Sequence, residues 1–139
     1  MIAAFKSEYA LDASALLAVI LNEPGHEQVR RVIDRAHIHA LNAAEVFGKL
    51  VREGVPPNEA KDCFEELNLD VIAEFGLPDA LLVGETLART RRQGLSLGDC
   101  VCLASAARRG SIVVTADRRW KELHGSRIAD CELKIQLIR

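Results

Sequence analysis

The sequence lacks the cysteine pattern of a disulfide-stabilised or zinc-binding protein. Its 139 residues include four cysteines, at Cys63, Cys100, Cys102 and Cys131. None belongs to a Cys-x-x-Cys pair, and Cys100-x-Cys102 is a poor fit to structural zinc spacing. Free cysteine is among the most buried residue types, so we expect all four to be reduced core residues of a cytoplasmic protein.

Long apolar runs are also missing. The longest stretch, Ala13 to Leu21, contains Ser14 and is too short to span a bilayer. Residues 1–10 carry Lys6 and Glu8 and show no apolar run that ends in a cleavage site. We therefore expect neither a membrane span nor a signal peptide.

Neither sign of charge predominates. The chain has 18 basic and 20 acidic residues and a formal net charge of −2, so its overall field does not attract nucleic acid. Any polyanion has to be bound by local basic patches. The hydrophobic fraction of 49% and the length are those of one folded domain, which we expect to span residues 1–139.

The chain does contain a regular alternation of apolar strands and amphipathic helices. This order predicts a three-layer α/β/α sandwich around a largely parallel sheet. We expect strands at 9–11, 38–41, 69–73, 112–115 and 133–138. We expect helices at 14–21 with Ser14 as its cap, 26–36, 42–52 with Asn42 as its cap, 56–67, 78–93 and 98–109.

Four acidic residues lie where such a fold binds its ligands. Asp12 and Asp117 directly follow two apolar strands, and ligands of open α/β sheets bind beyond the carboxyl ends of the strands. Glu45 and Asp99 fall in the first turns of two helices. Ligands that are all oxygen suit Mg²⁺ or Mn²⁺ better than zinc. The four acids are therefore our candidate catalytic and metal-binding residues.

Each acid also has a structural interpretation. Asn42-Ala-Ala-Glu45 and Ser96-Leu-Gly-Asp99 both fit a capping box, in which the third helical carboxylate bonds back to the cap. Asp117 fits a turn residue after its strand. Any one of these acids alone is explained without catalysis.

Asp12 is the acid whose position most requires a partner. It lies between an apolar strand and an apolar helix, where an unpaired carboxylate is costly. A nearby arginine, several backbone donors or a metal ion would satisfy it. Hydroxyls that orient carboxylates or hold a water lie close in sequence to three of the acids, at Ser14, Ser96 and Thr115.

Basic residues and histidines are less informative. Arg118 and Arg119 directly follow Asp117, where they could hold phosphates beside bound metal ions. The other arginine pairs have the pattern of solvated helix faces. His37 and His39 share one face of a strand, and a core or surface role suits them better than metal binding.

Four segments of the sequence together resemble a known family. The sequence is similar to the PIN-domain ribonucleases, and most closely to the VapC-type toxins of bacterial toxin–antitoxin pairs. The resemblance is carried by four segments in family order, namely Leu11-Asp12-Ala-Ser14, Asn42-Ala-Ala-Glu45, Leu95 to Gly110, and Ile112 to Trp120. Trp120 stands where phenylalanine is usual, which should preserve its packing.

The resemblance implies a function, a cofactor and partners. It implies that Asp12, Glu45, Asp99 and Asp117 bind one or two Mg²⁺ or Mn²⁺ ions and hydrolyse RNA, with Ser14 and Thr115 supporting them. It also implies a VapB-like antitoxin and a homodimer. The apolar stretch from Ala15 to Leu21 could form part of the antitoxin groove or simply belong to the core.

The sequence also has to be compared with other functions of α/β proteins. A phosphatase with a strand-end nucleophile needs Asp-x-Asp, but the second position here is Ser14. A phosphoacceptor receiver domain needs an acidic pair and a later lysine that are not clear here. A PIN-domain nuclease of RNA processing and a non-catalytic PIN-like binding module are the remaining alternatives. The sequence names neither the RNA nor its cleavage site.

Overall fold

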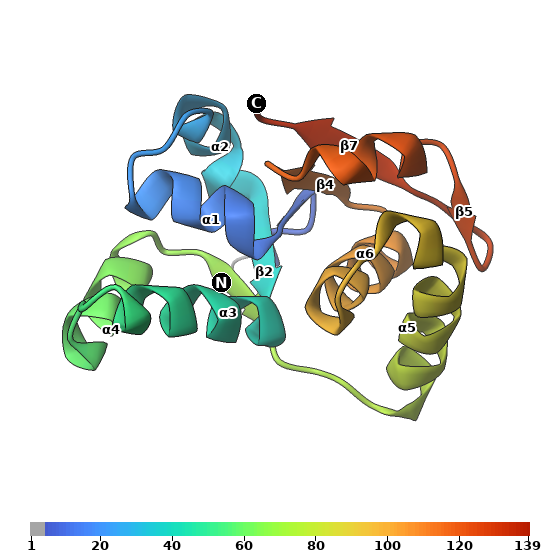
Figure 1. The fold of residues 1–139 in the computed structure, drawn as a ribbon, viewed down its shortest axis with the longest axis horizontal. Helices are drawn as coiled ribbons and strands as arrows, with labels where there is room; N and C mark the ends of the chain where they lie inside the picture. The colour runs from blue at the N-terminus through green and yellow to red at the C-terminus, as the bar shows by residue number, and fades with distance from the viewer. Residues whose placement is uncertain (1–4) are drawn as a thin grey trace.

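The computed structural model describes residues 5–139, in which a parallel sheet lies between two groups of helices (Figure 1). The sheet has five strands in the order β3-β2-β1-β4-β7, and every neighbouring pair is parallel. These strands are β1 (Tyr9–Leu11), β2 (Ala36–His39), β3 (Asp70–Ile72), β4 (Ile112–Thr115) and β7 (Lys134–Leu137). The expected three-layer α/β/α sandwich is confirmed.

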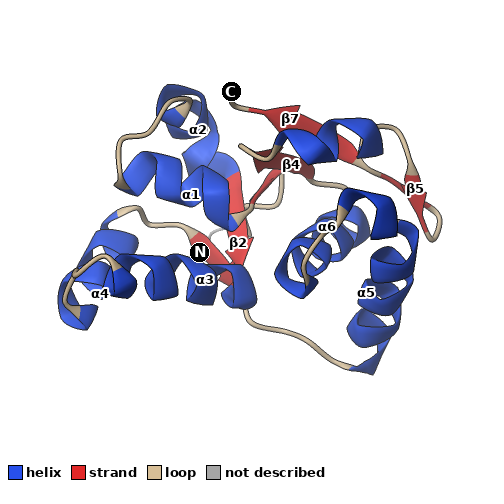
Figure 2. Ribbon diagram, in the orientation of Figure 1, coloured by secondary structure: helices blue, strands red, loops and turns tan. Residues whose placement is uncertain are grey.

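Two groups of helices cover the two faces of the sheet (Figure 2). One face carries α1 (Ala13–Ile20), α2 (His26–Val32), α3 (Ala40–Arg52) and α4 (Pro57–Glu66). The other carries α5 (Leu77–Arg89), α6 (Leu97–Arg109) and the 3₁₀ segment η3 (Arg118–Leu123). Short 3₁₀ turns η1 (Ile33–Arg35) and η2 (Arg91–Gln93) follow α2 and α5.

The alternation of strand residues builds two separate cores. Leu11 and Val114 belong to the core beneath α1–α4, whereas Ala10 and Val113 belong to the core beneath α5 and α6. Successive side chains of a strand point to opposite faces, so each short central strand serves both cores. Trp120 is fully buried in the second core, as expected for its packing role.

The chain changes direction between β1 and β4. After β1 it passes through α1 and α2 to β2 and then through α3 and α4 to β3. It returns through α5 and α6 on the opposite face to β4, which pairs with the other side of β1. Such a topological switch leaves a crevice at the carboxyl ends of the two strands, where α/β proteins bind their ligands.

The starts of two helices differ from our expectations. Asp12, not Ser14, caps α1, because its carboxylate accepts a hydrogen bond from the amide of Ala15. His39, not Asn42, caps α3 through its ring Nδ1, which accepts from the amide of Leu41 at 3.1 Å. The helix therefore starts at Ala40, and the expected capping box at Asn42 does not exist.

Several other boundaries also differ. The helix expected to reach residue 36 ends at Val32, and Ala36 already begins β2. The helix expected over 78–93 ends at Arg89, and η2 follows it. A two-stranded antiparallel hairpin of β5 (Arg127–Ile128) and β6 (Cys131–Glu132) was not expected.

The cysteine prediction is only partly confirmed. All four are free, and Cys100 and Cys102 are buried, but Cys63 is exposed on α4 and Cys131 is only half-buried. His37 and His39 lie buried in β2, as a core role requires. Residues 15–19 of α1 are likewise buried in the core, whereas Ile20 and Leu21 at the end of the stretch are half-buried.

The lengths and compositions of the described helices bear on the expectation of no membrane span. Among residues 5–139, none of the helices combines the length and the apolar content needed to cross a bilayer. The expectation of no signal peptide falls partly on residues 1–4, which lie outside the described part of the chain.

Candidate active site

Asp12 lies at the carboxyl end of β1 and is almost completely buried, with 5% of its surface exposed. Its carboxylate accepts hydrogen bonds from the Thr115 hydroxyl at 2.6 Å, the Ser14 hydroxyl at 2.7 Å and the Ala15 amide at 2.8 Å. Burial nevertheless prevails over these donors and raises the pKa of Asp12 to about 6. The carboxylate is therefore short of positive charge.

The two hydroxyls beside Asp12 also fix the loop that follows β4. Ser14 Oγ accepts from the Ala116 amide at 2.9 Å, and Thr115 Oγ1 accepts from the Asp117 amide at 3.0 Å. Each hydroxyl thus donates to Asp12 and accepts from the loop. This arrangement couples the position of Asp117 to that of Asp12.

Asp117 follows β4 and is held by an arginine two residues later. The guanidinium of Arg119 donates to both carboxylate oxygens, with Nε at 3.0 Å from Oδ1 and Nη2 at 2.6 Å from Oδ2. The Arg119 amide also donates to Oδ1 at 3.0 Å. Arg119 thereby lowers the pKa of Asp117 below its usual range.

Asp99 lies in the first turn of α6 and belongs to a capping box. Its Oδ2 accepts from the Ser96 amide at 2.9 Å, while Ser96 Oγ accepts from the Asp99 amide at 3.1 Å. The sequence allowed a cap or a site residue at this position. The geometry allows both, because a carboxylate has lone pairs beyond the one that the cap uses.

Glu45 lies in the second turn of α3 and packs against the start of α6. A Cβ atom on Gly98 would overlap the Glu45 carboxylate and lie 2.8 Å from its Cδ. Asn42 Nδ2 bridges the two helices, since it donates to the Gly98 carbonyl at 2.9 Å and to Glu45 Oε1 at 3.5 Å. Partial burial, and then repulsion from Asp99, raises the pKa of Glu45.

Asp99 connects the four acids into one cluster. Its negative charge contributes to the raised pKa values of Asp12 and Glu45, after the larger effect of burial. Its Oδ2 also lies 3.9 Å from Nη2 of Arg119, the side chain that binds Asp117. The fold therefore brings Asp12, Glu45, Asp99 and Asp117 together from β1, α3, α6 and the end of β4.

The donor set suits a hard divalent cation. All four donors are carboxylates, and the buried one lacks a full counter-charge, as Mg²⁺ or Mn²⁺ would provide. Within residues 5–139, however, no three Asp, Glu, His or Cys side chains already surround one point as metal ligands do. Three of the acids are instead bound to protein groups: Asp99 to the Ser96 amide, Glu45 to Asn42, and Asp117 to Arg119. The donor chemistry fits such an ion, and at least three of these carboxylates would have to draw closer together to share one.

Sequence reasoning missed the residues that act at long range. Nothing local indicated that Asn42 bonds to Gly98, 56 residues away. Gly98 itself carried a signal, since a glycine in the first turn of a helix suggests close approach of another group. The side chains of Arg118 and Arg119 have different partners. Arg119 binds the Asp117 carboxylate, whereas Arg118 Nε donates to the Arg139 carbonyl at 3.3 Å.

A basic hollow is lined in part by Arg118, the residue that follows Asp117 in the sequence. It is lined by the cationic side chains of Arg118, Lys121 and Arg139, together with Gln28 and the apolar Leu137 and Ile138. Arg139 is fixed there by a hydrogen bond to the Pro24 carbonyl at 2.8 Å. The protein's slightly negative net charge thus coexists with a local cluster of cationic side chains.

Comparison with protein families finds a match over most of the chain. The model of the PIN domain matches residues 9–125, which contain all four acids. The chain belongs to the PIN domain family. PIN domains are generally nucleases, and those nucleases generally use divalent metal ions. A comparison with curated protein sequences finds no match.

Solved structures share this PIN fold. VapBC from Salmonella typhimurium bound to DNA superposes with a TM-score of 0.71 at 21% identity, covering 95% of this chain and 98% of that chain. VapBC2 from Rickettsia felis bound to a DNA fragment from its promoter superposes with a TM-score of 0.67 at 15% identity. The match covers 92% of this chain and 98% of that chain. PAE2754 from Pyrobaculum aerophilum superposes with a TM-score of 0.60 at 22% identity, and the match covers 84% of each chain. At these identities the likeness establishes the fold of this PIN domain.

Proposed function

We propose that this PIN domain is a Mg²⁺- or Mn²⁺-dependent endoribonuclease and the toxin of a toxin–antitoxin pair. The observation that carries the proposal is Asp12, a buried carboxylate held by three donors at the topological switch. Asp99, Glu45 and Asp117 gather around it from other elements. A purely structural role does not account for this concentration of negative charge.

The acids are proposed to hold one or two ions. When bound, Mg²⁺ or Mn²⁺ activates water for attack on a phosphodiester and stabilises the charge that develops. Ser14 and Thr115 keep the Asp12 carboxylate in a fixed orientation, and Ser96 does the same for Asp99. Asn42 positions Glu45 from within its own helix.

The basic hollow is proposed to receive the RNA backbone. Its cationic side chains are those of Arg118, which directly follows Asp117, and of Lys121 and Arg139, and they would bind phosphates of an RNA whose backbone extends to the acids. These contacts are to phosphates and carry no base specificity. The RNA-binding role thus falls on Arg118 and its neighbours in the hollow, while Arg119 faces the acids.

The toxin role rests on the shared fold. The VapBC structures from Salmonella typhimurium and Rickettsia felis are complexes of the two VapBC components, and we propose a VapB-like antitoxin for this chain. Both would act in the cytoplasm. A short neighbouring reading frame with a DNA-binding N-terminus supports this role, whereas its absence favours a PIN nuclease of RNA processing.

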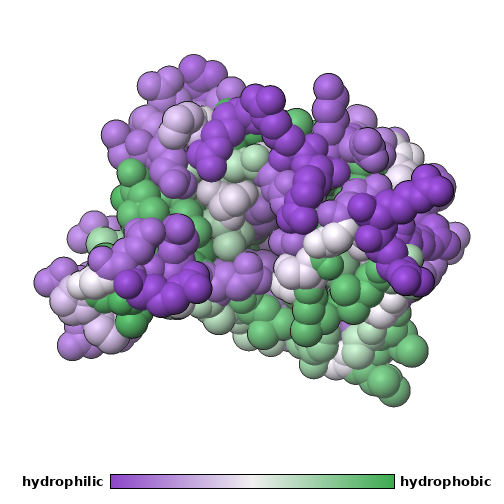
Figure 3. All heavy atoms as spheres, in the orientation of Figure 1, coloured by the Kyte–Doolittle hydropathy of each residue, from purple (hydrophilic) through white to green (hydrophobic). Residues whose placement is uncertain are grey.

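A homodimer is proposed through the apolar surface of α5. Leu77 and Leu81 are 73% and 69% exposed, four residues apart on one helix face, and Phe75 just before them is 43% exposed. Figure 3 shows the apolar surface that α5 contributes to. Exposed apolar patches mark interaction sites. Sedimentation at high concentration should show a dimer, and a strict monomer argues against this surface.

The purified protein should cleave single-stranded RNA only when a divalent cation is present. We expect products with Mn²⁺ or Mg²⁺, and a loss of at least about a hundredfold in rate with excess chelator, since the ion supplies the reactive water. The measurement is gel analysis of a labelled oligonucleotide. Release of phosphate from small esters instead would support a phosphatase. No Mn²⁺ binding and no cleavage would support a non-catalytic PIN-like module.

A further inference from the structure

Arg119 has more partners than a solvated surface arginine. Its Nε and Nη2 bind both oxygens of Asp117, and Nη2 lies 3.9 Å from Oδ2 of Asp99. Its Nη1 donates to the carbonyls of Gln93 and Gly94, each at 3.2 Å. One guanidinium thus joins the end of β4 to the loop before α6.

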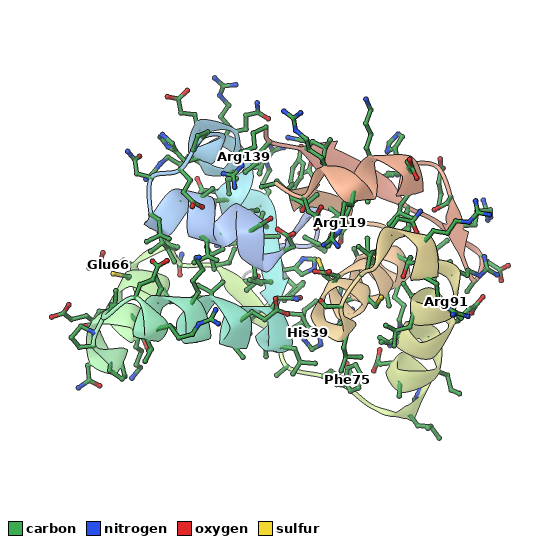
Figure 4. All side chains as sticks on the ribbon, viewed as in Figure 1. His39, Glu66, Phe75, Arg91, Arg119 and Arg139 are labelled. Carbon is green, nitrogen blue, oxygen red and sulfur yellow. The ribbon has the colours of Figure 1, made fainter. Side chains whose placement is uncertain are left out.

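The loop before α6 lies against the Arg119 guanidinium. Gly94 takes a left-handed conformation with φ of 65°, and a Cβ there would lie 3.8 Å from Arg119 Nη1. In Figure 4, Arg119 lies in the middle of the molecule between α1 and α6, while Arg91 lies at its outer edge. The Arg119 side chain is still 52% exposed, so it can swing out without disturbing the core.

The guanidinium stands between two of the acids proposed to bind metal. A carboxylate pair bridged by a cation is neutralised in the same way as a pair bridged by a metal ion. Among residues 5–139, neither Asp12 nor Glu45 forms an ion pair with a cationic side chain. Their side-chain partners are neutral, namely Ser14 and Thr115 for Asp12 and Asn42 for Glu45. Of the four acids, Asp99 and Asp117 therefore have a cation beside them, and Asp12 and Glu45 do not.

We infer that Arg119 is an internal counter-cation that occupies the Asp99–Asp117 half of the site and must leave before a divalent ion binds there. This inference rests on the proposed function. Asp12 and Glu45, which have no cation beside them, are free to bind an ion first. Once displaced, the planar fork of Arg119 is available to a phosphate of the substrate. Arg119 is thus a positioning residue that sets the metal affinity of one half of the site.

The test is the affinity for Mn²⁺, measured by calorimetric titration of the full chain in the absence of RNA. We expect Arg119→Gln to bind Mn²⁺ about tenfold more tightly than the unmodified protein, because the ion no longer displaces a charge-assisted ion pair. Arg118→Gln is the matched control: it removes the same charge one residue away, from a side chain bonded to the Arg139 carbonyl. Its affinity should stay within about twofold of the unmodified protein, since surface charges act weakly at a distance.

Arg119→Lys provides a second variant if the glutamine variant folds poorly. Lysine keeps the positive charge but lacks the planar guanidinium that binds both oxygens of Asp117. The Mn²⁺ affinity of Arg119→Lys should therefore lie between those of the unmodified protein and Arg119→Gln. Equal affinities in all four proteins, a weaker affinity in Arg119→Gln, or an equal gain in Arg118→Gln would each overturn the inference and leave the metal site standing. Absence of Mn²⁺ binding in every protein would instead overturn the proposed function.

Discussion

Replacing Asp12 with asparagine is expected to lower the rate of metal-dependent RNA cleavage by at least about a hundredfold while stabilising the fold. The buried carboxylate is ionised at pH 8 although its pKa is raised from 3.8 to about 6. That difference of about two units corresponds to about 3 kcal/mol of lost stability. Asparagine avoids this cost and caps a helix about as well as aspartate, but it has one acceptor oxygen fewer for the Ser14 and Thr115 hydroxyls, a loss of about 1 kcal/mol, so a net gain remains.

The pH dependence distinguishes this account from a simple structural role. Because the pKa of Asp12 is higher in the folded state than in the unfolded state, folding favours the protonated carboxyl. The resulting contribution to the free energy of unfolding is complete below about pH 4 and is lost as the pH rises through 6. The asparagine variant should therefore exceed the unmodified protein in free energy of unfolding at pH 8, and by less at pH 5. Urea unfolding without metal provides the measurement. A less stable variant at pH 8, or one with full activity, contradicts the assignment.

Replacing Gly98 with alanine is expected to reduce cleavage by about tenfold to a hundredfold without unfolding the protein. The added methyl group would overlap the Glu45 carboxylate, so Glu45 has to leave its position beside α6. Displacement of one charged group in a catalytic site typically costs this much in rate. The helix itself should gain stability, because alanine is a better helix former than glycine.

Gly48→Ala is the matched control for this substitution. Gly48 lies in α3, the helix that carries Glu45, and a Cβ there meets nothing within 4 Å. Both alanine variants should be at least as stable as the unmodified protein in thermal unfolding, and only Gly98→Ala should lose activity. Equal activity of the two variants would mean that the position of Glu45 against α6 has no part in the reaction.

The strand-end acids could be predicted from sequence because the argument is local and topological. Asp12 and Asp117 each follow a short apolar strand, and the carboxyl ends of parallel strands lie at the same edge of a sheet. β1 and β4 were expected with the bounds that the structure has. Asp99 was recognisable as a capping residue from the same local pattern.

The remaining features depend on contacts between distant segments. Asn42 has the local pattern of a helix cap, but its side chain donates to the carbonyl of Gly98, so His39 takes the cap instead. Arg118 and Arg119 look equivalent in the sequence. Only the Gln93 and Gly94 carbonyls, supplied by the loop before α6, select Arg119 for the inward position. Long-range partners of this kind leave no periodic signal in the chain.

The central claim is that Asp12, Glu45, Asp99 and Asp117 form a divalent cation site. The most direct test is anomalous X-ray diffraction from crystals soaked in Mn²⁺. We predict an anomalous peak at about 2.1 Å from a carboxylate oxygen of Asp12, with an oxygen of Asp99 or Glu45 completing the contact. Crystals saturated with Mn²⁺ that show no peak among these four residues, or a peak only at another place, would contradict the account.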